Sequence, residues 1–211
     1  MNKEEFIKSL KDLGIELTDE QVIKLNKFYN LLIEWNEKIN LTRITEEQEV
    51  YLKHFYDSLT IAKVVDLSTK ETLCDVGTGA GFPGIVLKIV YPNLKITLVD
   101  SLLKRVNYLN TIIKDLELEN IHAIHSRGED FEEKFDIVTA RAVANIEKLL
   151  GFTMHLVNKE GMFIAMKGNI DEEMTPEVIN KVNKKYQITE IKKFLLPKEN
   201  SNRSLVVIKN K

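Results

Sequence analysis

The chain of 211 residues is 44% hydrophobic, which is ordinary for a globular protein, and its length fits one domain with an extension. Its 30 basic and 32 acidic residues give a formal net charge of −2, which argues against nonspecific polyanion binding but allows a local basic patch. The single cysteine, Cys74, excludes an intramolecular disulfide, and no apolar run approaches the ~20 residues of a membrane span. We therefore expect a soluble, cytoplasmic protein with no membrane partner.

The N-terminal part of the chain, residues 1–68, has the period of helices throughout. Thr18 and Gln21 have the spacing of a capping box, in which each side chain accepts a hydrogen bond from the other residue's backbone. Thr45 and Gln48 repeat this spacing, so they predict the start of a further helix. We expect these residues to form an N-terminal helical extension.

From residue 69 onwards, apolar runs of strand length alternate with helical segments. The predicted strands are residues 72–76, 95–100, 121–125, 135–140, 161–167, 186–196 and 204–209. Strands joined by helices form a mostly parallel sheet with right-handed crossovers. The last two predicted strands have no helix between them, so they are expected to pair antiparallel. The pattern predicts that residues 69–211 form a Rossmann-like α/β domain, with a seven-stranded, mostly parallel sheet and an antiparallel last strand, as in class I methyltransferases.

A glycine-rich loop, DVGTGAGFPG, begins at Asp75, directly after the first predicted strand, and reads in two registers. From Gly77 it is G-x-G-x-G, and from Gly79 it is the G-x-G-x-x-G of dinucleotide-binding proteins. A carboxylate beside the loop favours the sulfonium and ammonium of S-adenosylmethionine and disfavours a pyrophosphate. Asp100 ends the next strand, where its carboxylate would accept hydrogen bonds from the ribose of either ligand.

The overall layout favours the methyl donor, because the chain shows no second catalytic domain, as nicotinamide enzymes usually need. Two other interpretations stay open. In one, the chain is a nicotinamide oxidoreductase or a catalytically silent nucleotide binder. In the other, its glycines only form a tight turn.

Several motifs together resemble one family. They are DVGTGAGFPG, DSLLKR, HSRGEDF, ARAVA, MKG and NRSLVVIK, with WNEKINLT and HFYDSL upstream. Over nearly the whole chain they resemble the bacterial 16S rRNA guanine-N7 methyltransferase family RsmG, also called GidB. The resemblance implies that 16S rRNA or the small-subunit particle is the partner. It also implies that the residues binding S-adenosylmethionine are Gly77, Phe82, Asp100, Gly128, Glu129 and Arg141. The chemistry of the loop adds Asp75 and Gly79 to this set.

Guanine N7 has a free lone pair, so its methylation needs positioning more than a general base. The chain lacks the Asn/Asp-Pro-Pro-Tyr motif that is usual for exocyclic amines, and its four histidines lack zinc-ligand spacing. We expect no metal. Cys74 is interpreted as a core residue. Arg141, after the fourth strand, is the candidate catalytic residue, in contact with either the cofactor's methionine end or the guanine edge. The alternative is a structural ion pair.

Contacts with RNA are less apparent in the sequence. The substrate-binding candidates are basic residues at strand ends and at the start of a helix, namely Lys104, Arg105, Arg127, Lys167 and Arg203. His54 and Asp57 lie one helical turn apart and either close the site from the helical extension or pack the helix. A class I methyltransferase acting on a small molecule or a protein is the alternative to an RNA methyltransferase.

Overall fold

The computed structural model describes residues 1–199 and 201–211. Within these residues the strands form one seven-stranded sheet with the order β3-β2-β1-β4-β5-β7-β6. The strands are β1 (Thr72–Val76), β2 (Lys95–Asp100), β3 (Ile121–His125), β4 (Phe135–Arg141), β5 (Val157–Lys167), β6 (Tyr186–Leu195) and β7 (Asn202–Asn210). Strand β7 runs antiparallel between β5 and β6, while the β1 to β5 pairs are parallel. The fold predicted from the sequence is confirmed.

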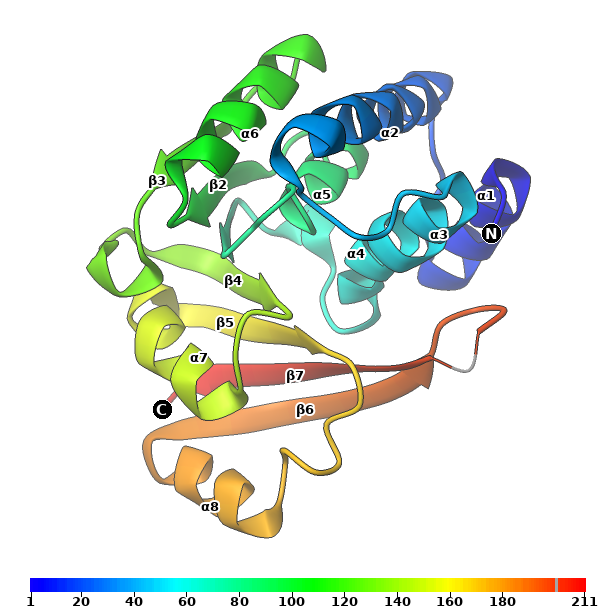
Figure 1. Ribbon diagram of the computed structural model, residues 1–211. Helices are drawn as coiled ribbons and strands as arrows, with labels where there is room; N and C mark the ends of the chain where they lie inside the picture. The colour runs from blue at the N-terminus through cyan, green and yellow to red at the C-terminus, as the bar shows by residue number, and fades with distance from the viewer. Residues whose placement is uncertain (200) are drawn as a thin grey trace.

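Helices cover both faces of this sheet (Figure 1). They are α1 (Lys3–Leu10), α2 (Asp19–Ile39), α3 (Glu47–Val50), α4 (Asp57–Leu59), α5 (Gly84–Val90), α6 (Leu103–Asp115), α7 (Ile146–Thr153) and α8 (Pro176–Lys185). One core cluster joins the sheet to α5, α6 and the N-terminal helices, and a second joins it to α7 and α8. Because both faces are covered, β1 and β4 are buried over nearly their whole length. No helix in the described part of the chain is long and apolar enough to cross a bilayer.

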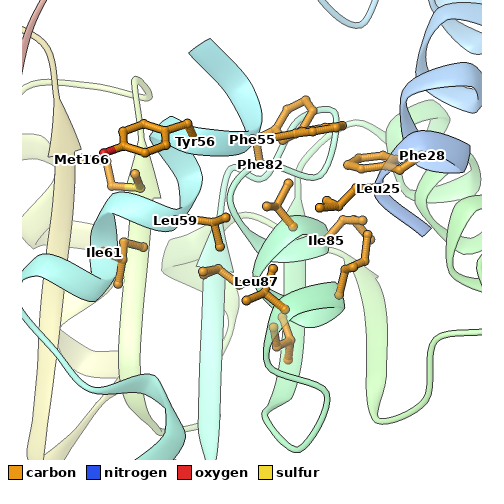
Figure 2. Packing of buried hydrophobic residues seen from close by; sticks show 14 of the residues in the cluster. Leu25, Phe28, Phe55, Tyr56, Leu59, Ile61, Phe82, Ile85, Leu87 and Met166 are labelled. Atoms are coloured by element: carbon orange, nitrogen blue, oxygen red, sulfur yellow. The ribbon is translucent and has the colours of Figure 1, made fainter. Parts of the chain in front are cut away.

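Aromatic packing joins the N-terminal helices to the glycine-rich loop. Phe28 of α2 lies against Phe55, with ring centroids 5.7 Å apart and planes 13° apart. Phe82 of the loop contacts both rings, at centroid distances of 5.4 and 6.1 Å, as Figure 2 shows. Such pairs stabilise a core beyond the area that they bury. The N-terminal helices therefore share a core with the loop.

The structure confirms one predicted helix start and corrects the other. Thr18 and Gln21 form the capping box of α2. The box predicted at Thr45 is wrong, because α3 begins at Glu47 with Glu46 as an N-cap that makes no side-chain hydrogen bond. Between α3 and α4 lies a π-helical turn, Tyr51–Tyr56, which the sequence did not predict. Such wide turns often occur at functional sites, and this one contains His54.

Candidate active site

Two adjacent cavities lie at the carboxyl ends of the parallel strands, where the strand order reverses between β1 and β4. The larger, of about 370 Å³, is lined by the glycine-rich loop, the ends of β4, β5 and β7, and residues of the N-terminal helices. The smaller, of about 260 Å³, is lined by the ends of β1 and β2, the turn after β3, and α7. Gly77 lines both cavities, so they meet at the loop.

The backbone of the loop distinguishes the two glycine registers. Gly77, Gly79 and Gly81 have φ values of +71°, +61° and +94°, which L side chains rarely adopt. Gly84 has no such φ, and its missing Cβ serves packing, because a Cβ there would lie 2.2 Å from Cδ2 of Leu98. The glycines whose backbone conformation disfavours any other residue are those of the G-x-G-x-G register.

Asp75 lies beneath the loop and is completely buried. Its Oδ2 accepts hydrogen bonds from the Thr78 hydroxyl (2.7 Å) and the Gly84 N–H (2.9 Å), while Oδ1 has no partner among the described residues. Burial raises its pKa to about 6, against the opposing effect of the two hydrogen bonds. Asp75 thus supports the loop and is absent from the linings of both cavities.

Asp100 lies on the wall of the smaller cavity. Its carboxylate accepts hydrogen bonds from the N–H groups of Gly79 (3.0 Å) and Leu102 (2.9 Å). The Arg105 guanidinium, one of the predicted RNA contacts, pairs with this carboxylate at 3.4 Å. Arg105 therefore lies beside the predicted ribose-binding residue.

The turn after β3 forms another part of the smaller cavity's wall. Gly128 is buried in a 3₁₀ turn, Gly128–Asp130, and Glu129 beside it is exposed. Both line the smaller cavity, as does the exposed Arg127. Lys104 is exposed and is absent from both linings.

Arg141 lies at the end of β4 and lines the larger cavity. Its guanidinium donates to the Lys53 carbonyl (3.0 Å), to Asp57 Oδ2 (3.3 Å) and to Nδ1 of His54 (3.2 Å). It also lies over the Phe82 ring, 5.3 Å from the centroid. Burial lowers the pKa of Arg141, and the neighbouring Asp57 carboxylate raises it. Arg141 thus joins the sheet to the π-helical turn.

The other basic residues of the larger cavity are paired. Arg203 of β7 donates to Asp57 Oδ1 at 3.0 Å, so the buried Asp57 carboxylate binds two arginines. Lys167 pairs with Glu173 at 2.9 Å and donates to the Ala144 carbonyl at 2.7 Å. Of the five predicted RNA contacts, these two line the larger cavity.

The family model described as rRNA small subunit methyltransferase G, GidB, matches residues 21–206. The chain belongs to this family. The resemblance seen in the sequence is confirmed, and membership of the GidB family favours a methyltransferase over a nicotinamide oxidoreductase.

Relatives within the GidB family align over nearly the full length. The Ribosomal RNA small subunit methyltransferase G of Macrococcus caseolyticus is 46% identical, over 100% of this chain and 91% of its own. The protein of the same name from Bacillus subtilis is 45% identical, over 99% of this chain and 90% of its own. Among solved structures, a SAM dependent methyltransferase from Aquifex aeolicus has a TM-score of 0.58 at 18% identity and covers 83% of this chain and 97% of its own. A precorrin-6y C5,15-methyltransferase from Geobacter metallireducens has a TM-score of 0.56 at 14% identity, over 82% and 92%. These two show the fold alone.

In this GidB family member the two cavities fit S-adenosylmethionine. A buried carboxylate, Asp100, faces the smaller one. Where the two cavities meet, Gly77 leaves space because it has no side chain. A Cβ there would lie 2.8 Å from Cγ2 of Val143. Asp100, Gly128 and Glu129 line the smaller cavity, Gly79 lines the larger one, and Gly77 lines both.

Sequence reasoning missed several residues of the larger cavity in this GidB family member. Thr42 and Phe194 line it, and neither was a candidate. The motif WNEKINLT, part of the family resemblance, contains Thr42 but gave no role for it. The sequence left two roles open for His54 and Asp57, closing the site or packing the helix. Both residues line the cavity.

Proposed function

We propose that this protein transfers a methyl group from S-adenosylmethionine to N7 of a guanine in 16S rRNA. One observation supports this above the others: a cavity with a ribose-binding carboxylate and a cavity lined by arginines meet at Gly77. The first suits the adenosine of the cofactor, and the second suits an anionic acceptor. Membership in the GidB family points to the same acceptor.

The groups lining the larger cavity suit a methyl acceptor atom that carries no proton and so has none to lose on methylation. S-adenosylmethionine, when bound, supplies an electrophilic methyl group on its sulfonium. Asp57 is occupied by Arg141 and Arg203, and Nδ1 of His54 accepts a hydrogen bond from Arg141. Neither group is free to remove a proton. An exocyclic amine or a hydroxyl must lose a proton on methylation, whereas the N7 lone pair does not, so the cavity fits N7.

The residues of the chain therefore act by position and charge. Arg141, held by three acceptors, presents its remaining donor capacity to the cavity. Guanine offers the acceptor O6 beside N7, whose own lone pair must stay free to attack the methyl group. Arg203 and Lys167 line the same cavity and suit the phosphates of the RNA. We propose that the acceptor is 16S rRNA or the small-subunit particle, and that the protein acts in the cytoplasm.

The test is nucleoside mass spectrometry of 16S rRNA from cells with and without this gene. We expect one 7-methylguanosine to disappear in the deletion strain and to return with the wild-type gene. An unchanged 7-methylguanosine content would contradict the proposal. Calorimetry with S-adenosylhomocysteine and with NAD tests the cofactor separately, and we expect binding of the first alone.

A further inference from the structure

A loop between α2 and α3 contributes Leu41, Thr42 and Ile44 to the wall of the larger cavity. Hydrogen bonds hold Thr42 rigidly in this loop. Its N–H donates to Oδ1 of Asn36 at 2.8 Å, and its hydroxyl oxygen accepts from the N–H of Ile44 at 3.1 Å. The same oxygen lies 2.9 Å from Nε2 of His54. Thr42 is therefore a fixed side chain at the surface of the cavity.

The contacts of His54 fix which of its nitrogens carries the proton. Arg141 approaches Nδ1 at 3.2 Å, and a guanidinium can only donate hydrogen bonds, so Nδ1 is the acceptor. Burial, assisted by the charge of Arg141, lowers the pKa of His54 to about 3, so the ring is neutral near pH 7. A neutral imidazole with an accepting Nδ1 carries its proton on Nε2. That N–H donates to the Thr42 hydroxyl oxygen.

The Thr42 oxygen thus accepts two hydrogen bonds, one from Ile44 and one from His54. A hydroxyl has two lone pairs and one proton, so its own proton is free for another acceptor. No acceptor for it occurs among the side-chain hydrogen bonds of the described residues. The chain of donors from Arg141 through His54 to Thr42 leaves a hydroxyl donor at the cavity wall.

We infer that Thr42 is a specificity-determining residue, whose hydroxyl donates a hydrogen bond to the O6 carbonyl of the target guanine. This rests on the proposed function. A neutral, immobile donor suits the edge of a base, while Arg203 and Lys167 suit phosphates. His54, in the wall beside it, stacks on Phe82 with centroids 4.4 Å apart and planes 16° apart, so this side of the cavity is flat.

The same donor rejects adenine. Adenine has an amino group, itself a donor, where guanine has O6. A site that presents only donors beside N7 would leave two donors facing each other, and an unpaired buried donor is costly. Thr42 thereby distinguishes two purines that both have a free N7.

The test measures kcat/KM for wild type, Thr42→Val and Thr42→Ser on two matched rRNA substrates. One carries guanine at the methylated position, and the other carries 2,6-diaminopurine, which retains N7 and the 2-amino group but replaces O6 with an amino group. We expect wild type to prefer guanine by 10-fold or more, on the order of one lost buried hydrogen bond. Thr42→Val should lose about 10-fold on guanine and most of the preference. Thr42→Ser should resemble wild type.

Controls separate this role from a structural one. Thr45→Val changes an exposed residue of the same loop and should leave both rates unchanged. Affinity for S-adenosylhomocysteine should stay within about twofold of wild type in every variant. If Thr42→Val unfolds, Thr42→Ala gives space for a water to accept from His54 and provides the same comparison.

Thr42 variants that retain the full preference for guanine would overturn the inference, even with activity intact. Failure of the wild-type protein to methylate the guanine substrate at N7 would instead overturn the proposed function. The two failures are therefore distinguishable.

Discussion

The carboxylate of Asp100, at the end of β2, accepts a hydrogen bond from the backbone N–H of Gly79, 21 residues earlier in the chain, at 3.0 Å. The residue that suits the ribose thus also holds the glycine-rich loop that follows β1. We therefore expect cofactor affinity and loop conformation to depend on this one side chain.

Asp100→Ala should weaken binding of S-adenosylhomocysteine about 10- to 100-fold, because hydrogen bonds to a charged group contribute roughly 1.5–3 kcal/mol. Isothermal titration calorimetry measures this directly. Lys104→Ala, an exposed change in the adjoining helix, is the matched control and should alter the affinity less than twofold. Equal affinities for wild type and Asp100→Ala would remove Asp100 from the cofactor site.

Arg141→Ala should reduce the rate of methyl transfer on the order of 100-fold or more, as loss of a fixed donor at a reaction centre does. Arg141→Lys should also be impaired, since one ammonium cannot replace a planar fork bound to Lys53, His54 and Asp57. Single-turnover assays at saturating cofactor report the rate, and circular dichroism reports the fold. Arg43→Ala, a change of an exposed arginine in the loop between α2 and α3 that is absent from the cavity lining, is the control. A folded Arg141→Ala protein with wild-type turnover would limit this residue to a structural ion pair.

Stability should depend on pH through His54, whose pKa in the folded protein is about 3, below its ordinary 6.5. Between these values the unfolded chain binds a proton that the folded protein excludes, so this contribution to stability is lost as pH falls below 6.5. Asp75, with a raised pKa, has the opposite effect, so the useful quantity is the difference between wild type and His54→Gln. In urea denaturation, the free energy of unfolding of wild type minus that of the variant should fall by about 2 kcal/mol from pH 7 to pH 5. A constant difference would mean that His54 takes up a proton equally well in the folded and unfolded states.

Two glycines near α7 should respond in opposite directions to alanine. Gly151 is exposed within the helix, and a Cβ there has nothing within 4 Å, so Gly151→Ala should stabilise the protein by about 0.5–1 kcal/mol. Gly128→Ala would put a Cβ 2.9 Å from the Phe152 carbonyl oxygen and should cost about 1–3 kcal/mol. Gly128→Ala should also weaken S-adenosylhomocysteine binding, because Gly128 lines the smaller cavity. Thermal unfolding of both variants checks the signs, and the same sign for both would contradict the packing argument.

Most strands of this fold were predictable from the sequence because they bury an apolar run, as β1, β2, β4, β5 and β7 do. β1 and β2 agree with their predicted bounds, and β5 is longer, starting at Val157 instead of residue 161. The capping box at Thr45 failed because the spacing alone does not fix where a helix begins. No local sequence pattern predicts the π-helical turn. It is accompanied by tertiary contacts, such as the hydrogen bond that the Lys53 carbonyl accepts from Arg141.

The candidate site was only partly predictable, for a related reason. Asp100 and Gly77 follow strands, and the carboxyl ends of parallel strands define a binding edge. Hydrogen bonds within the group of Arg141, His54, Asp57 and Arg203 join residues up to 146 positions apart, and no local sequence pattern encodes such a relation. The division of the chain at residues 68 and 69 stays a prediction about its organisation, and the packing of Phe28 on Phe82 shows how closely the two parts meet.

The position of β7 has a consequence for biosynthesis. This strand follows every other element in the chain, yet it lies inside the sheet between β5 and β6, and Arg203 to Leu205 on it line the larger cavity. A nascent chain lacks that wall until the segment carrying β7 has left the exit tunnel and inserted beside β5. The cavity wall is therefore complete only after translation has passed this strand, and a copy that ends before β7 lacks Arg203 at the cavity.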